Sequence, residues 1–241
     1  MELHGKTALV TGGAKRVGRT IALALASKGA KVILHFKSSL KEAKDTATEI
    51  QGLGATCHLV QADLNVSTSI QKMLSEIKKI GPVDILVNSA SLYFKTPVET
   101  ATEAQFDELM GANLKAPYLL SVEIGKEMKL RGGKIINIAD WSGFRPYKDY
   151  SAYCTTKGGL ITLTKALARD LAPKVCVNAV APGPVMAPSD LSETEKEAIA
   201  KTTALGRWGN PSDVANAVLY LLESDFANGT VLVVDGGRSL A

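Results

Sequence analysis

The sequence predicts an α/β fold with one doubly wound domain, in which a seven-stranded, mainly parallel sheet carries helices on both faces. Seven short apolar runs rich in Val, Ile and Leu recur along the 241 residues, separated by longer segments with helical spacing. The runs are almost continuously apolar, as expected of strands that are covered on both faces. Seven strands alternating with about six helices favour parallel crossovers over hairpins.

Each expected element follows from this alternation. The expected strands are 6–11, 31–36, 57–62, 83–88, 133–139, 175–181 and 230–235. Helical spacing fills the segments between them, for example 15–29 and 102–129. No linker, low-complexity tract or internal repeat interrupts the pattern, so residues 1–241 are expected to form a single domain.

One connection is longer than the others. From Pro182 to about Leu205 a proline-rich turn leads into a short, charged helix. Long loops at strand ends often act as lids. We therefore expect a substrate-binding loop or lid at 184–206, with a solvated surface excursion as the alternative.

Composition narrows the class of protein. Hydrophobic residues make up 46% and charged residues 22%, with a formal net charge of +4, which is typical of a soluble globular protein. No basic run interleaved with aromatic residues is present, so neither nucleic acid nor a membrane surface is an expected partner. Cys57, Cys154 and Cys176 lie far apart, which predicts no disulfide framework and no metal site. Without a signal-peptide pattern or a membrane-length apolar run, a cytoplasmic location is expected.

The first turn, TGGAKRVG at 11–18, predicts a dinucleotide-binding site. Gly12 and Gly18 occupy the outer positions of a glycine-rich phosphate turn. Small residues let the backbone approach a pyrophosphate, and the following helix offers free N–H groups and the positive end of its dipole. The alternative is an ordinary tight connection between strand and helix.

The end of the second strand predicts which dinucleotide binds. An acid there would bind the adenine ribose hydroxyls and repel a 2′-phosphate. This chain instead has Lys37, Ser38 and Ser39, and Arg16 can reach the same corner. Cations and hydroxyls suit a phosphate, so NADP(H) is predicted over NAD(H). Capping of the next helix is the alternative role for either serine.

A tyrosine and a lysine form the candidate proton-transfer pair, although such a pair taken alone would favour a solvated helix face. Tyr153 has Lys157 four residues on, one helical turn away on the same face. A phenol with a pKa near 10 is a poor acid–base group at neutral pH. A nearby ammonium and a positively charged nicotinamide would both lower that pKa. Tyr147 and Tyr150 lack such a lysine and are expected to form pocket wall or packing.

Six motifs in order resemble those of the short-chain dehydrogenases/reductases, which have a Rossmann-type fold, over nearly the whole chain. The motifs are TGGAKRVG (11–18), AD (62–63), NSAS (88–91), Asn113 in GANLKAP, Tyr153-x-x-x-Lys157, and PG (182–183) followed by Val185. Arg16 stands where the family usually has the middle glycine of its first turn.

The resemblance implies roles for further residues. It places Asp63 at the adenine, Asn88 and Ala90 beside the cofactor ribose, Asn113 at a proton-relay water, and Val185 at the nicotinamide amide. The turn, the second-strand end and the resemblance together give the expected cofactor site: Gly12, Lys15, Arg16, Val17, Gly18, Lys37, Ser38, Ser39, Asp63, Leu64, Asn88, Ser89, Ala90, Tyr153, Lys157, Pro182, Gly183 and Val185.

One position departs from the wider family. A serine about thirteen residues before the tyrosine usually binds the substrate carbonyl, and this chain has Asp140 there. An ionised carboxylate accepts hydrogen bonds but donates none. It therefore suits a heterocycle with N–H or amino groups better than a carbonyl oxygen. Alternatively, Asp140 caps the turn and Ser142 shifts inward to serve as the usual serine.

This substitution is similar to the pattern of pteridine reductases and related dihydropteridine-type reductases. These proteins carry Asp–Tyr–Lys at the same positions, a TGxxKRxG turn, a second-strand end similar to HFKSS at 35–39, and an aromatic residue after the NAS stretch. By this comparison Ser91 contacts the pterin and Tyr93 stacks it against the nicotinamide. Tyr93 stands where phenylalanine is familiar, and Ser38 where an arginine often binds the 2′-phosphate.

The sequence thus predicts an NADPH-dependent reductase of a pterin such as dihydrobiopterin, dihydromonapterin or dihydrofolate. The expected catalytic residues are Tyr153, Lys157, Asp140 and Asn113, and the expected substrate contacts are Ser91, Tyr93, Asp140 and Tyr153. The alternative is a 3-oxoacyl-acyl-carrier-protein reductase or another carbonyl reductase, and a more remote one is a non-catalytic NADP(H)-binding regulator. A Ser–His–Asp hydrolase is disfavoured, because no histidine lies near a nucleophile-elbow sequence.

The assembly is expected to be a homotetramer. The apolar helix LITLTKALARDLA after Lys157 resembles one that family members pack between subunits. The alternative is a core-facing helix in a monomer.

Overall fold

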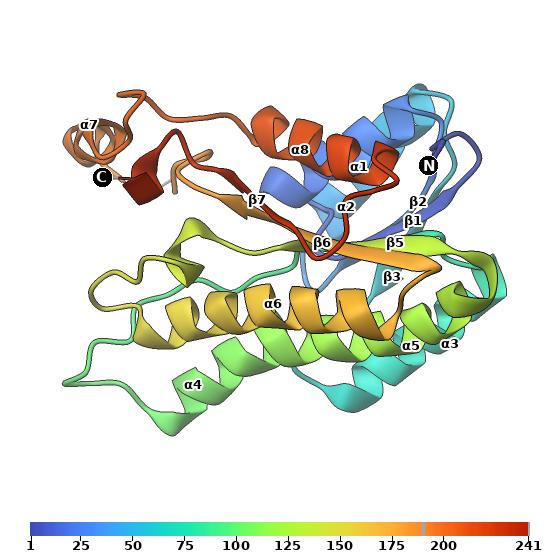
Figure 1. The fold of residues 1–241 in the computed structure, drawn as a ribbon, viewed down its shortest axis with the longest axis horizontal. Coiled ribbons are helices and arrows are strands. Elements are labelled where there is room, and N and C mark those ends of the chain that lie inside the picture. Colours follow the sequence, from blue (N-terminus) through green and yellow to red (C-terminus); the bar gives the residue numbers. More distant parts are fainter. Residues whose placement is uncertain (189–190, 241) are drawn as a thin grey trace.

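The computed structural model describes residues 1–188 and 191–240, and it has three layers, a central sheet between two sets of helices (Figure 1). All six strand pairings are parallel, in the order β3-β2-β1-β4-β5-β6-β7. The strands are β1 (Thr7–Val10), β2 (Lys31–Phe36), β3 (Cys57–Gln61), β4 (Ile85–Asn88), β5 (Gly133–Ile138), β6 (Val175–Pro182) and β7 (Val231–Val234). The predicted seven-stranded, doubly wound fold is confirmed.

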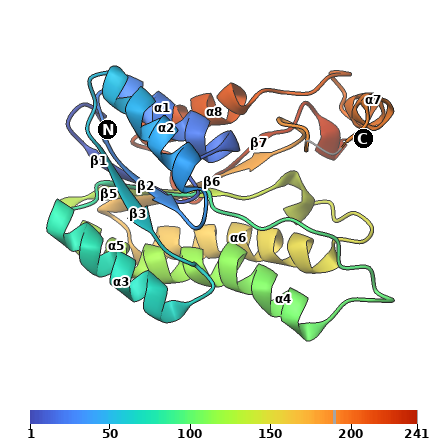
Figure 2. The same cartoon turned by 180° about the vertical axis from the view of Figure 1, so that it is seen from behind.

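Eight α-helices lie within the described residues, rather than about six. They are α1 (Arg16–Ser27), α2 (Leu40–Gly52), α3 (Ser67–Ile80), α4 (Glu103–Met110), α5 (Ala116–Arg131), α6 (Ser151–Asp170), α7 (Glu193–Lys201) and α8 (Pro211–Glu223). Figures 1 and 2 show α1, α2 and α8 on one face of the sheet and α3, α4, α5 and α6 on the other. No helix among the described residues is long and apolar enough to cross a membrane.

Both faces of the sheet are buried, which explains why the strands are continuously apolar. Val10, Val32 and Leu34 pack under α1 and α8, with Leu25 and Val218 among the fully buried side chains of that core. A second core, on the opposite face, buries residues of α3 and α5 against the same strands. Every residue of β4 and β5 is buried, so neither strand shows polar alternation.

The segment 102–129 contains two α-helices separated by a π-helix. Thr102 caps α4 through a reciprocal capping box with Gln105. The chain then passes through the π-helix η1 (Gly111–Lys115) and continues directly as α5. Such π segments are common at functional sites, and this one carries Asn113.

The predicted lid spans a loop and a helix. Residues 184–188 follow β6, and Ser192 caps α7 through a capping box with Glu195. No residue of α7 is buried, and Figure 1 shows the helix at the edge of the molecule, away from the sheet. Residues 189–190 of the predicted lid lie outside the described residues.

Candidate active site

The candidate site lies at the carboxyl ends of the strands, where the strand order reverses. β1 pairs with β2 on one side and with β4 on the other, so the connections after β1 and β4 leave in opposite directions. Open α/β sheets bind their ligands at this switch point. The glycine turn follows β1 and the NSAS segment follows β4, and Asp140 follows β5 at the same edge.

Asp140 and Tyr153 are joined by a hydrogen bond. The Tyr153 hydroxyl donates to Asp140 Oδ2 at 3.1 Å. The other oxygen, Oδ1, accepts from the Ser142 N–H at 2.8 Å and so caps the short 3₁₀ helix η2 (Trp141–Gly143). The carboxylate therefore both caps this turn and contacts the phenol, two roles that the sequence offered as alternatives.

The side chain of Ser142 is not oriented to act as the usual serine. Its side chain is fully buried, and its hydroxyl makes no hydrogen bond within the described residues. The η2 turn packs closely on α6: a Cβ added at Gly143 would lie 3.0 Å from the Lys157 carbonyl carbon. The hydroxyl therefore points into the protein, and the available polar group at the site is Asp140.

Lys157 lies beneath the tyrosine. Its Nζ donates to the Ile138 carbonyl at 3.0 Å and lies 5.6 Å from the centre of the Tyr153 ring. Burial lowers the pKa of Lys157 to about 8, and the nearby Asp140 carboxylate opposes this shift. The lysine thus titrates near physiological pH.

The Tyr153 phenol has a raised pKa, whereas the sequence predicted a lowered one. Burial contributes most to raising its pKa, and the charge of Asp140 adds to the effect. The expectation counted the lysine and a charged nicotinamide, but neither the burial of the phenol nor the carboxylate that accepts from its hydroxyl. Tyr153 therefore holds its proton at neutral pH, which suits a proton donor better than a base.

An aromatic cluster of Tyr93, Trp141, Tyr147, Tyr150 and Tyr153 forms one wall of the site. Tyr93 stacks on Tyr150 with ring centres 4.7 Å apart and meets the Tyr153 ring edge-on at 4.9 Å. Trp141 stacks on Tyr147, whose hydroxyl donates to that of Tyr93 at 3.4 Å. Tyr93 is half-exposed, so the cluster presents an aromatic surface beside the Tyr153 phenol.

Asn113 holds the segment that carries Tyr93. Its side chain accepts from the Leu92 N–H at 2.7 Å and donates to the Leu92 carbonyl at 2.9 Å. It also donates to Thr156, one residue before Lys157, at 3.3 Å. The amide thus ties the loop after β4 to α6. Ser91, on the same loop, is exposed, and its hydroxyl bonds only to the Leu92 carbonyl within the described residues.

The glycine turn leaves room only for backbone. Gly12 has a φ of +64°, and a Cβ there would lie 2.9 Å from Ala90 Cα. A Cβ at Gly18 would lie 2.3 Å from the Gly12 carbonyl oxygen. Arg16 has a left-handed φ of +55°, which accounts for the glycine usual in the family at this position. Its guanidinium donates to the Met186 carbonyl at 3.1 Å, so it links the turn to the predicted lid.

Two residues that the sequence reasoning did not assign organise this turn. The Thr11 hydroxyl accepts from the Ser89 and Ala90 N–H groups at 2.9 and 3.1 Å. His35 is buried; its Nδ1 accepts from the Gly12 N–H, and its Nε2 lies 3.1 Å from the Ala62 carbonyl. These partners require the neutral tautomer with the proton on Nε2, and burial lowers the pKa of His35 accordingly.

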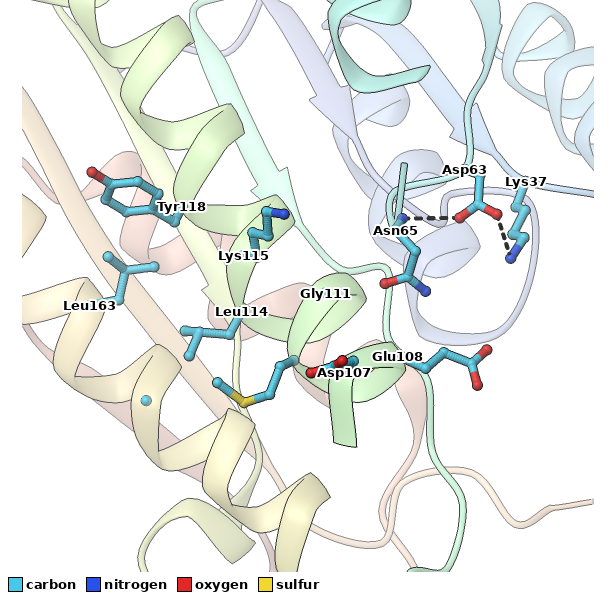
Figure 3. Close-up of a pocket in the computed structure, with 12 residues that line it drawn as sticks. Lys37, Asp63, Asn65, Asp107, Glu108, Gly111, Leu114, Lys115, Tyr118 and Leu163 are labelled. Carbon is cyan, nitrogen blue, oxygen red and sulfur yellow. Dashed lines mark hydrogen bonds and ion pairs between the residues drawn. The ribbon is translucent and has the colours of Figure 1, made fainter. Parts of the chain in front are cut away.

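At the end of β2, Lys37 and Ser38 are exposed and Ser39 is partly buried. Lys37 pairs with Asp63 at 2.8 Å, and this contact is the main cause of the lowered pKa of Asp63 (Figure 3). Ser39 stands at the cap position of α2, yet its hydroxyl makes no capping bond. Lys37 and Asp63 also line a cavity of about 1010 Å³.

The remaining predicted cofactor residues divide into open and buried positions. Lys15 is exposed at the start of α1, while Val17 packs on the core and Leu64 is buried. Asn88 is buried, and its amide donates to Ser121 of α5 and to Asn137 of β5. Its side chain therefore braces the ends of β4 and β5, rather than lying in the open part of the site.

The segment after β6 closes the other side. The Gly183 N–H donates to the Val234 carbonyl at 2.9 Å, directly after the buried Pro182. A Cβ at Gly183 would lie 2.6 Å from Asp235 Cα, so this turn also requires glycine. Val185 packs against the α1 side of the core and lines a second cavity of about 460 Å³, together with Pro184 and Leu205.

The comparisons agree with this geometry. A family model described as short chain dehydrogenase matches residues 6–198. The chain belongs to the short chain dehydrogenase family. The 3-oxoacyl-[acyl-carrier-protein] reductase FabG of Aquifex aeolicus is 38% identical, over 98% of both chains. The 2-dehydro-3-deoxy-D-gluconate 5-dehydrogenase of Pseudoalteromonas atlantica is 35% identical, over 98% of this chain and 96% of that one.

Among solved structures, FolM alternative dihydrofolate reductase 1 from Brucella canis, complexed with NADP, superposes with a TM-score of 0.93. It is 31% identical, over 100% of this chain and 96% of that one. As a short chain dehydrogenase, the protein is an oxidoreductase. Its close-fitting turn around Gly12 and Gly18 and the free N–H groups at the start of α1 fit the pyrophosphate of a dinucleotide.

Proposed function

We propose that this short chain dehydrogenase reduces a pterin or dihydropteridine with NADPH. The hydrogen bond from Tyr153 to Asp140 is the observation that carries the proposal. At the position where the family usually has a hydroxyl donor, the site presents an acceptor whose two oxygens are already oriented. The N–H and amino groups of a pterin complement such a carboxylate, whereas a carbonyl oxygen does not.

The residues divide the chemistry between them. When bound, the reduced nicotinamide cofactor supplies the hydride to the carbon of a ring C=N bond. Tyr153 gives its proton to the ring nitrogen, so that the C=N bond becomes CH–NH. The charge of Lys157 stabilises the phenolate that remains. Asp140 accepts hydrogen bonds from the substrate amino group and from the phenol, which fixes their relative position. Tyr93, beside Tyr153, offers the heterocycle an aromatic face.

Preference for NADP(H) is part of the proposal. Lys37, Ser38 and Ser39 form the corner where an acid would otherwise exclude a 2′-phosphate. The Brucella protein in the superposed structure is complexed with NADP. Lys37→Asp should raise the Kd for NADPH and lower that for NADH; an unchanged ratio of the two affinities would refute the assignment.

A second candidate is reduction of a 3-oxoacyl thioester. The identity to the Aquifex protein over almost the whole chain favours it. Asp140 counts against it, because a carboxylate is a poor partner for an oxygen that gains negative charge. A non-catalytic NADP(H)-binding regulator would bind the cofactor without turning over either substrate.

One assay separates these functions. NADPH oxidation is followed with a dihydropterin, with an acetoacetyl thioester and with simple ketones. Pterin turnover alone supports the proposal, thioester turnover alone refutes it, and tight NADPH binding without turnover indicates the regulator. Asp140→Ser should lower pterin turnover and favour carbonyl reduction. Pterin kinetics that this variant leaves unchanged would contradict the role of Asp140.

We also propose a homotetramer. The outer surfaces of α5 and α6 meet at the larger cavity, where Leu114, Tyr118 and Leu163 line an apolar region (Figure 3). Burying such a surface between two copies of the chain would remove apolar area from water.

A further inference from the structure

The segment after β7 folds into a tight turn that fixes the position of Arg238. Both oxygens of Asp235 accept main-chain hydrogen bonds, from Gly237 at 2.8 Å and from Ser239 at 2.7 Å. Arg145, in the loop before α6, donates to the Ser239 carbonyl at 3.2 Å. The turn is thereby held against the loop that carries Trp141 and Tyr147, and Figure 1 shows it beside α7.

Arg238 is connected to the catalytic phenol through the aromatic cluster. Its guanidinium lies 4.4 Å from the centre of the Trp141 ring. Trp141 directly follows Asp140 and stacks on Tyr147, whose hydroxyl bonds to that of Tyr93. A guanidinium stacked on an aromatic face keeps the N–H donors at its edge free for a ligand.

Within residues 1–188 and 191–240, the guanidinium makes no ion pair and no hydrogen bond. The carboxylates of Asp140 and Asp235 act on the charge of Arg238, but the hydrogen bonds they accept come from Tyr153, Ser142, Gly237 and Ser239. Arg238 is half-buried, and this burial lowers its pKa although those acids oppose the shift. A partly desolvated cation with unused donors is unfavourable unless an anion accepts hydrogen bonds from it.

We propose that Arg238 is a specificity-determining residue that binds a carboxylate on the tail of the substrate. The planar fork of a guanidinium matches a carboxylate in two parallel hydrogen bonds. The identity of the reacting ring rests on the proposed function, but the negative charge of the tail does not. Among pterins, the proposal selects dihydrofolate, whose glutamate is anionic, over dihydrobiopterin, whose side chain is neutral.

The test compares charged and neutral members of two substrate pairs. The pterin pair is dihydrofolate and dihydrobiopterin; the carbonyl pair is 4-carboxybenzaldehyde and benzaldehyde. Steady-state kcat and KM are measured with NADPH for the native enzyme and for Arg238→Gln. We expect the substitution to raise KM for the charged member about tenfold, the loss of one charge-assisted contact. KM for the neutral member should change less than twofold, with kcat unchanged for both.

Two further variants distinguish recognition from packing. Arg238→Lys keeps the charge but loses the fork, so it should recover part of the affinity for the charged member. Arg131→Gln is the matched control. Arg131 pairs with Asp84 at the amino ends of the strands, opposite the site, so its replacement should leave kcat and KM unchanged for both substrate pairs. The advantage of the charged member should also fall as salt is raised.

The outcomes separate this proposal from the proposed function. If only the carbonyl pair is reduced and its charged member loses affinity in Arg238→Gln, the pterin function is wrong and the role of Arg238 stands. If pterins are reduced with equal KM for both members, the pterin function stands and the role of Arg238 is overturned. An equal rise in KM for the charged and the neutral members, which a packing role would give, also overturns it. So does the absence of turnover with either pair.

Discussion

At the scale of single residues, we expect Lys157 to set the pH range of activity. Burial brings its pKa to about 8, so its charge is present below that pH and is lost as the pH rises through it. Because this charge stabilises the Tyr153 phenolate, kcat/KM for reduction should be flat below pH 8 and fall above it.

A variant of Asp140 tests whether Lys157 causes this pH profile. The carboxylate raises the pKa of Lys157, so Asp140→Asn should move the fall in kcat/KM to lower pH. A profile that Asp140→Asn leaves in place, or one without a fall near pH 8, would contradict this coupling. Steady-state rates between pH 5.5 and 10 provide the measurement.

His35 links pH to stability. Its folded-state pKa lies below the ordinary value of 6.5, so below pH 6.5 the unfolded chain binds a proton that the folded chain does not. Stability should therefore be constant above that pH and fall as the pH drops below it, by about 1 kcal/mol per pH unit.

Urea unfolding at pH 7.5 and 5.5, with and without NADPH, measures this effect. His35→Gln should remove the histidine's share of the pH dependence. His58→Gln is the matched control, because His58 is exposed on the neighbouring strand β3 and should leave the dependence intact. Equal slopes in the two variants would show that another group is responsible.

Single residues also mark the limit of what the sequence could predict. Spacing selected Tyr153, Lys157 and Asp140 correctly as neighbours, because a helical turn and a strand end fix those distances. The prediction for the pKa of Tyr153 left out burial and the charge of Asp140, which both raise it, because neither is visible in the local sequence. The role of His35 depends on the Gly12 and Ala62 backbones, which follow β1 and β3 on either side of β2 and share no local sequence pattern.

At the scale of elements, the glycine turn gives a test of close packing. Gly12→Ala combines a left-handed backbone with a Cβ that would lie 2.9 Å from Ala90 Cα. We expect a loss of stability greater than the 1–2 kcal/mol of backbone strain alone, and a Kd for NADPH raised about tenfold or more. Fluorescence titration and thermal unfolding measure the two effects.

Gly54→Ala is the matched control for this turn. Gly54 has a φ of +81°, and an added Cβ there would meet nothing within 4 Å. It should therefore show the backbone strain without the clash and without any change in cofactor affinity. Equal effects at Gly12 and Gly54 would mean that the approach to Ala90 is unimportant.

Other elements show why boundaries were harder to predict than their existence. The helical period over 102–129 is unbroken in sequence, yet a π-helix interrupts it at Gly111–Lys115. There, Asn113 satisfies both main-chain groups of Leu92, a partner 21 residues away. A long-range hydrogen bond of this kind leaves no periodic signal, so the pattern alone predicts a plain helix.

At the scale of the whole molecule, the parallel sheet was predictable because its strands are covered on both faces. Residues 133–139 and 83–88 read as continuous apolar runs, and β5 and β4 lie within them. The contact between the C-terminal turn and Trp141 was not predictable. Arg238 reaches Trp141 only because β7 lies beside β6 at the edge of the sheet.

The assembly of the whole molecule can be tested at the apolar surface of α5 and α6. Tyr118 on α5 is 48% exposed and lines the larger cavity together with Leu163 of α6. If this surface joins two copies of the chain, a carboxylate placed in it would be buried without a partner, at a cost of several kcal/mol. Tyr118→Asp and Leu163→Asp should therefore reduce the molecular mass of the native tetramer to that of a dimer or monomer.

Light scattering after size-exclusion chromatography measures this mass, and Leu53→Asp controls for the added charge. Leu53 is 52% exposed at the end of α2, on the other face of the sheet from α5 and α6. Its replacement should leave the mass unchanged, because no neighbouring copy is expected to cover it. The native chain could prove to be a monomer, or all three variants could remain tetramers. Either result would show that the apolar surface of α5 and α6 lies outside any subunit interface.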